Sequence, residues 1–166
     1  EKVGLLAARP ELRDGRPEGA EKPAGEPPRV AARDRSYSPE ATLAPDAERP
    51  ESTPGALLRV ELDPDHWLSA GSDGEVQAMV EGRRVFTPVS FDKGRNAGLY
   101  VAEERLVAAG LVWPEARKAL AEKAYLVDQP FGRGRVIAFA EDPNFRAMAP
   151  ATELLFLNAV LLGPAF

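Results

Sequence analysis

The stretch that most constrains the fold is residues 132–164, near the end of the chain. It reads GRGRVIAFAEDPNFRAMAPATELLFLNAVLLGP, which places a tight turn, an apolar strand, an acidic loop and an apolar helix in succession. The strand at Arg135–Ala140 and the helix at Ala151–Leu162 are too apolar to stand alone in water. We therefore expect them to form the closing unit of a layered domain of the α/β class.

The chain before this unit predicts short strands and one further helix. A helix should begin at Trp113-Pro114-Glu115, because proline and an acidic residue are favoured in a first helical turn. A short helical turn is expected at His66–Gly71, and Glu81-Gly82 predicts a hairpin between two strands. The expected strands span residues 56–62, 75–80, 84–89, 96–101, 105–109 and 124–127.

Composition changes sharply over residues 8–55, which contain nine of the 16 prolines and few bulky apolar side chains. Such a segment buries too little apolar surface to offset its ordering entropy. We expect residues 8–55 to form a flexible, Pro- and charge-rich insertion, with residues 1–7 as the end of an upstream helix. The C-terminal part of an α/β domain should then occupy residues 56–166.

Charge and composition exclude several classes of function. The formal net charge of -5 disfavours binding to nucleic acid or to an anionic membrane as the main role. No run of about 18 apolar residues occurs, so no membrane span is expected. The chain has no cysteine, which excludes disulfides, thiolate nucleophiles and cysteine-based zinc sites.

His66 is the single histidine and follows Asp63-Pro64-Asp65. One histidine and two carboxylates could bind a divalent ion or form a general base if a turn brought them together. The sequence offers no second cluster of ligands and no HExxH motif. The alternative is structural, with an aspartate capping the helical turn and the histidine bonded to a neighbouring loop.

Asp142 and Arg146 form a second candidate ligand-binding site. They follow the apolar strand in the sequence EDPNFR, and ligands of α/β proteins commonly bind beyond the carboxyl ends of strands. An Asp-Pro turn is also an ordinary way to leave a strand, with the carboxylate accepting backbone hydrogen bonds. We identify no catalytic residue here, because no Ser/His/Asp or Cys/His arrangement is present.

Several blocks of the sequence resemble the C-terminal end of large bacterial zinc carboxypeptidase-like proteins of the M14 family. These blocks are PGALLRV, DHWLSAG, VFTP, GRGRVIAFAEDPNFR and TELLFLNAVLLGP. In that family a class I glutamine-amidotransferase-like domain of the flavodoxin type follows the peptidase domain. The resemblance covers about Ala56 to Phe166 and implies a partial flavodoxin-like sheet layered with helices.

The resemblance implies a parent protein and not an activity of this chain. Neither the peptidase's zinc ligands nor the cysteine of an amidotransferase can be placed on it. We therefore expect a non-catalytic accessory domain, with zinc bound only in the parent and the upstream peptidase domain as partner. Secretion leaders are common in that family, which implies a periplasmic or secreted location, although this sequence shows no leader. The alternatives are a stand-alone peptide- or sugar-binding module and a hydrolase that uses His66.

Overall fold

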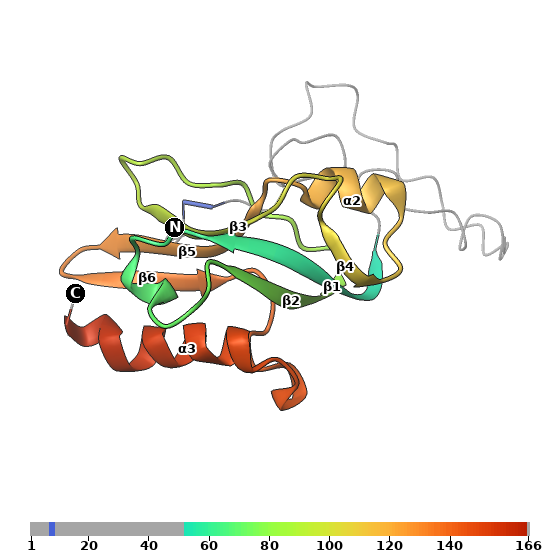
Figure 1. Ribbon diagram of the computed structural model, residues 1–166. Coiled ribbons are helices and arrows are strands. Elements are labelled where there is room, and N and C mark those ends of the chain that lie inside the picture. The colour runs from blue at the N-terminus through green and yellow to red at the C-terminus, as the bar shows by residue number, and fades with distance from the viewer. Residues whose placement is uncertain (1–6, 9–51, 166) are drawn as a thin grey trace, which may run out of the picture.

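The computed structural model describes residues 7–8 and 52–165, which form a mixed α/β domain built on a curled antiparallel sheet (Figure 1). The strands are β1 (Thr53–Leu62), β2 (Glu75–Gly82), β3 (Arg95–Tyr100), β4 (Val107–Gly110), β5 (Ala124–Phe131) and β6 (Gly134–Phe139). The α-helices are α2 (Pro114–Leu120) and α3 (Pro150–Leu162), and the 3-10 turns are η1 (Trp67–Ser69), η2 (Phe145–Ala147) and η3 (Gly163–Ala165).

The strands lie in the order β2-β1-β3-β5-β6, and β4 pairs with β1 beside this path. Every strand pairing among the described residues is antiparallel. The α/β class is thus confirmed. A flavodoxin-type sheet is built from parallel strands joined by helical crossovers, so the flavodoxin-like layering expected from the resemblance is not confirmed.

Most of the expected elements form, but residues 84–89 are not a strand and do not form a hairpin with β2. Instead the Phe86 carbonyl accepts a hydrogen bond from Ala124 N. Val89 N donates to Asn96 Oδ1, and Asn96 Nδ2 donates to the Val89 carbonyl. Pro88 also lacks the N–H that a strand needs. These partners draw the segment toward β3 and β5, away from β2.

The boundary of the first strand also differs from the expectation. The strand begins at Thr53, so residues 53–55 belong to the sheet and not to the Pro-rich insertion. Gly55 adopts a positive φ of 123°, which glycine tolerates, at the irregular pairing with β2. Residues 1–6 and 9–51, with the expected helix end and most of the insertion, lie outside the described residues.

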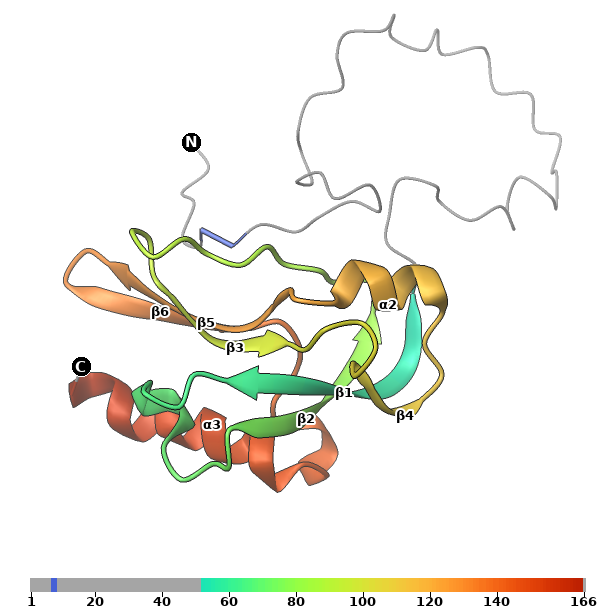
Figure 2. The ribbon, with the colours of Figure 1, turned by 45° about the horizontal axis from the view of Figure 1, so that its top comes forward.

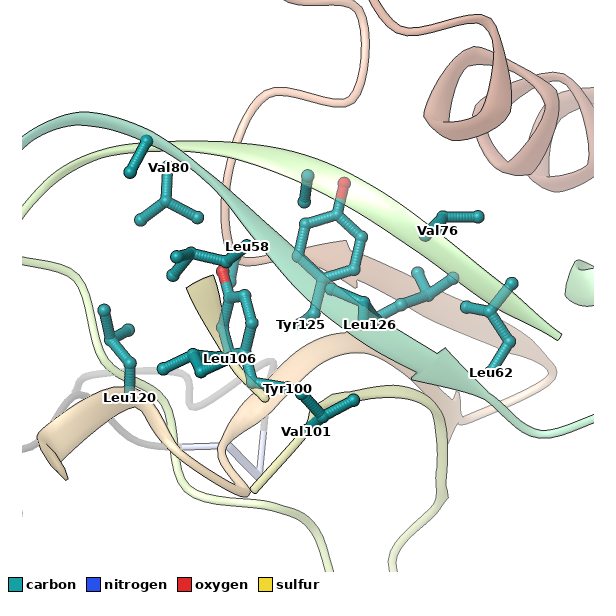
Figure 3. Close-up of a cluster of buried hydrophobic side chains, with 14 of the residues drawn as sticks. Leu58, Leu62, Val76, Val80, Tyr100, Val101, Leu106, Leu120, Tyr125 and Leu126 are labelled. Atoms are coloured by element: carbon teal, nitrogen blue, oxygen red, sulfur yellow. The ribbon is translucent and has the colours of Figure 1, made fainter. Parts of the chain in front are cut away.

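Alternation along β1 and β2 places one apolar face against the core. Leu58 and Val60 on β1 lie beside Ala78 and Val76 on β2 in the register, and all four are buried. Figure 3 shows Tyr100 and Tyr125 among these aliphatic side chains, and further core residues come from β3 to β5 and α2. Burial of each large side chain contributes about 1.5–3 kcal/mol to folding.

Helix α3 lies along one side of the sheet and α2 lies on the other, as two views show (Figures 1 and 2). Leu155 is fully buried in the core, and Asn158 donates hydrogen bonds of 2.9 Å to the carbonyls of Leu68 and Ala70. The helix therefore fixes η1 against the sheet. No helix in the described part of the chain is long and apolar enough to cross a membrane.

Candidate functional site

His66 immediately precedes η1 and caps it with its own side chain. Its backbone is extended (φ -91°, ψ 134°), and Nδ1 accepts a hydrogen bond of 3.2 Å from Leu68 N. Ser69 Oγ donates to the carbonyls of Asp63 and His66, which closes the turn. Asp63 accepts from Asp65 N at 3.1 Å. The histidine itself is thus the cap, a role that we expected an aspartate to fill.

The other ring nitrogen of His66 faces Asp128, in the β5 strand. Nε2 lies 3.3 Å from Asp128 Oδ2, and the same oxygen accepts a 2.7 Å hydrogen bond from Arg135 on β6. The His66 and Asp128 side chains are 7% and 9% exposed. The Arg135 guanidinium lies 5.3 Å from the centre of the Trp67 ring. These four side chains, which we call the His66 cluster, join η1 to the β5–β6 hairpin.

Burial is the main influence on the ionisation of His66. Loss of water lowers the pKa of His66 below its usual 6.5, and this outweighs the opposing influences of Asp128 and Asp63. The ring is therefore neutral at pH 7, with Nδ1 accepting from the backbone and Nε2–H donating toward Asp128. Both nitrogens are engaged, so neither is available to take a proton from a substrate without breaking the cap.

The His66 cluster is also a poor fit for a metal ion. Among the described residues no group of three His, Cys, Asp or Glu side chains is placed to hold one. The third member of the cluster, Arg135, is a cation that would repel a divalent ion. Zinc in the parent protein, which the resemblance implies, stays a prediction.

The structure places Asp142 and Arg146 in the loop after β6. Asp142 is exposed and accepts a 2.9 Å hydrogen bond from Asn144 N, the turn-forming contact that an Asp-Pro sequence favours. Arg146 is exposed in η2, with a left-handed backbone (φ 50°) and its guanidinium 5.1 Å from the centre of the Phe145 ring. Among the described residues no hydrogen bond or ion pair links Asp142, Arg146 and His66 to one another.

Glu141 is a buried carboxylate that the sequence analysis did not select. Its side chain is 4% exposed, and Oε2 lies 3.0 Å from a terminal nitrogen of Arg84, whose side chain is 62% exposed. Its other oxygen, Oε1, is buried without a hydrogen-bond partner among the described residues. Burial raises the pKa of Glu141 from 4.5 to about 7, against the lowering effect of Arg84.

The buried acids Asp128 and Glu141 are the polar residues that sequence reasoning missed. One signal was available for Asp128, which ends the apolar run Ala124–Val127 within a strand. An acidic side chain in such a run is seldom buried unless it is paired. No comparable signal marked its partners, since Arg135 and His66 are brought to Asp128 only by the hairpin and the η1 turn.

Comparisons with protein families, with curated proteins and with solved structures find no match to this chain.

Proposed function

We propose that this chain is a non-catalytic accessory domain, and that the outer face of α3 docks onto another domain of a larger protein. The observation that carries the proposal is the apolar character of α3 on all sides. Phe156, Leu157, Val160 and Leu161 are 38%, 50%, 54% and 71% exposed, while Leu155 on the opposite side is buried in the core. A helix that is apolar all round is typical of the interior of a larger structure.

The four exposed side chains, which we call the outer face of α3, form one continuous surface. Phe156 and Val160 are one helical turn apart, as are Leu157 and Leu161. The only charged residue of α3 is Glu153, in its first turn. Contiguous apolar surface of this kind marks an interaction site on a folded protein, and its lack of charge favours an apolar partner surface.

The geometry of the His66 cluster favours this role over catalysis. A hydrolase using His66 would need a free ring nitrogen, and both nitrogens are engaged within the protein. A binding module built on His66, Asp142 and Arg146 would need these residues to converge, and no described contact joins them. The accessory role requires neither feature.

The resemblance to M14 zinc carboxypeptidase-like proteins supplies the identity of the proposed parent. In this proposal the partner is the upstream peptidase domain, the zinc is held there, and the protein acts in the periplasm or outside the cell. The antiparallel sheet would then flank the parallel core of a class I glutamine-amidotransferase-like domain of the flavodoxin type. A structural or substrate-presenting role fits such a module.

The first test is the sequence of the open reading frame upstream of Glu1. We expect an HxxE zinc motif with a distant histidine there, and a reading frame that starts close to Glu1 would refute the accessory role. The second test replaces Leu157 and Leu161 by glutamine in the full-length protein. We expect the peptidase and this domain to unfold in separate thermal transitions in the double variant and together in the wild type.

A matched control for the second test is Phe91→Ser. Phe91 is 84% exposed and lies outside α3, in the loop before β3. This change should leave the joint unfolding transition intact. Separate transitions in the wild type, or joint unfolding in the double variant, would refute docking through α3.

A further inference from the structure

Strand β6 is an edge of the sheet whose outer side is not paired within the described part of the chain. The sheet order β2-β1-β3-β5-β6 ends at this strand, and its pairing with β5 covers Gly134–Phe139. Alternate backbone groups in this stretch therefore point away from the sheet. An edge of this kind can pair with a strand from another polypeptide.

The register of β6 identifies which backbone groups point outward. Ala140 N donates to the Tyr125 carbonyl, so these two residues form a hydrogen-bonded pair. Bonded and non-bonded pairs alternate along an antiparallel ladder, so Ala138 bonds to β5 while Ile137 and Phe139 occupy non-bonded positions. The N–H and C=O groups of Ile137 and Phe139 therefore face the free edge, and no residue that the structure describes bonds to them.

The edge of β6 lacks the charged side chains that commonly protect a free edge. Residues 136–139 are uncharged, and Arg135 before them donates a 2.7 Å hydrogen bond to Asp128 within the protein. The opposite edge strand, β2, carries the exposed acids Glu75 and Glu81, which disfavour the approach of an apolar strand. Of the two edges, that of β6 is the one that an uncharged strand fits.

One stripe of helix α3 lies along β6. The centre of the Phe156 ring is 6.4 Å from that of Phe139, and a Cβ added to Gly163, at the end of the helix, would lie 3.6 Å from Ile137 Cδ1. Phe156, Val160 and Gly163 share one face of the helix, because they follow each other at intervals of four and three residues. Val160, which is 54% exposed, therefore lies beside the outward-facing part of β6.

We propose that β6 pairs with an extended, uncharged strand of the domain that docks on α3, so that the sheets of the two domains become continuous. This inference rests on the proposed accessory role and names the backbone contacts made in that docking. An extended backbone presents a donor and an acceptor at every second residue, which matches the spacing of Ile137 and Phe139. The added strand would cover Phe156 and Val160, so its side chains on that face should be apolar.

Amide hydrogen–deuterium exchange, measured in this chain and in the full-length protein, tests the pairing. In this chain alone the amides of Ile137 and Phe139 should exchange at close to their intrinsic rates, because no described acceptor bonds to them. In the full-length protein we expect the exchange of both amides to slow by at least roughly 100-fold. The Ala138 amide, which bonds to β5, is the internal control and should be protected in both samples.

The outcomes distinguish the strand pairing from the docking of α3. If the two domains unfold in one transition while the Ile137 and Phe139 amides still exchange rapidly, α3 docks and the strand pairing is refuted. Separate unfolding transitions with rapid exchange of both amides would refute both proposals. Slow exchange of both amides in this chain alone would also overturn the pairing with another domain, and a dimer in size-exclusion chromatography would then identify a second copy as the occupant of the edge.

Three substitutions in β6 complete the test. Ile137→Pro removes an outward N–H, so the domain should keep its fold while the Phe139 amide in the full-length protein exchanges as fast as in this chain alone. Ile137→Ala is the matched control, because it loses the same packing but keeps the N–H, and Phe139 should stay protected. Ala138→Pro removes an N–H that bonds to β5 and should lower the thermal midpoint of the domain. Slow exchange of Phe139 in a folded Ile137→Pro variant would overturn the pairing.

Discussion

Replacing Asp128 by alanine should destabilise the fold more than any loss of an exposed acid. Asp128 Oδ2 accepts from Arg135 at 2.7 Å and faces His66 Nε2 at 3.3 Å, and the side chain is 9% exposed. The variant loses a charge-assisted hydrogen bond and leaves the His66 N–H without an acceptor. Part of this loss is offset, because the variant no longer has the desolvation cost of the buried carboxylate. The net loss should be about 2–4 kcal/mol of unfolding free energy at pH 7.

Urea unfolding followed by tryptophan fluorescence measures this loss, with Asp128→Asn and Glu75→Ala as companions. The amide side chain in Asp128→Asn keeps an acceptor oxygen for the partners, so about half of the loss should be recovered. Glu75 also pairs with two arginines, Arg59 and Arg105, but its side chain is 38% exposed, so its removal should cost less than about 1 kcal/mol. Equal losses for Asp128→Ala and Glu75→Ala would refute the claim that the His66 cluster fixes η1 to the hairpin.

Four other substitutions test the packing of the sheet and of α3. Leu155→Ala should cost about 2–5 kcal/mol in urea unfolding because its side chain is fully buried, whereas Leu161→Ala, at a site 71% exposed, should cost less than about 0.5 kcal/mol; equal costs would mean that α3 is oriented differently. Gly110→Ala should lower the free energy of unfolding by about 1–3 kcal/mol, because Gly110 has a φ of 94° and an added Cβ would lie 3.0 Å from the Ala56 Cα. An unchanged thermal midpoint would contradict this close contact between Gly110 and Ala56. Asn158→Ala removes two hydrogen bonds of 2.9 Å to η1 and should cost about 1–2 kcal/mol, with amide exchange of Ala70 rising in parallel; unchanged exchange there would show that α3 does not hold η1.

The sequence predicted well those elements whose signals are local. Helix α3 is flanked by Pro150 at its start and Gly163 at its end, and β6 is an apolar run between a glycine turn and an acidic loop. These patterns predicted both elements to within one residue at each end. Residues 84–89 have the composition of a strand, but their backbone does not pair with that of β2. The Phe86 carbonyl accepts from Ala124 N, which is distant in sequence, and Val89 N donates to the side chain of Asn96. Tertiary contacts decided the structure of that segment.

The candidate site was predicted less well, for a similar reason. The single histidine was visible in the sequence, and the structural alternative for it expected an aspartate to cap the turn and the histidine to bond to a neighbouring loop. Instead His66 itself caps the turn, and its other nitrogen faces a residue of strand β5. Its partner Asp128 is 62 positions away and is brought to it by the sheet. Glu141 precedes Asp142 directly, yet one is buried and the other exposed. Both residues lie beyond the end of β6, and Glu141 contacts Arg84, which lies 57 positions earlier in the chain, so the local sequence does not determine which of the two is buried.

Two of the ionisable side chains, those of His66 and Glu141, have opposite effects on stability as the pH changes. The folded state lowers the pKa of His66, so the unfolded state binds more protons as the pH falls below 6.5, and stability falls with it. The folded state raises the pKa of Glu141 from 4.5 to about 7, so stability falls as the pH rises through that interval. These two pH dependences of the free energy of unfolding partly cancel in the wild type. A constant free energy between pH 5 and pH 7 would therefore not show that the pKa of either group is unshifted. The variant Glu141→Gln separates the two contributions, because it removes the contribution of Glu141 and keeps that of His66. The free energy of unfolding of this variant should rise with pH over the range in which that of the wild type stays constant.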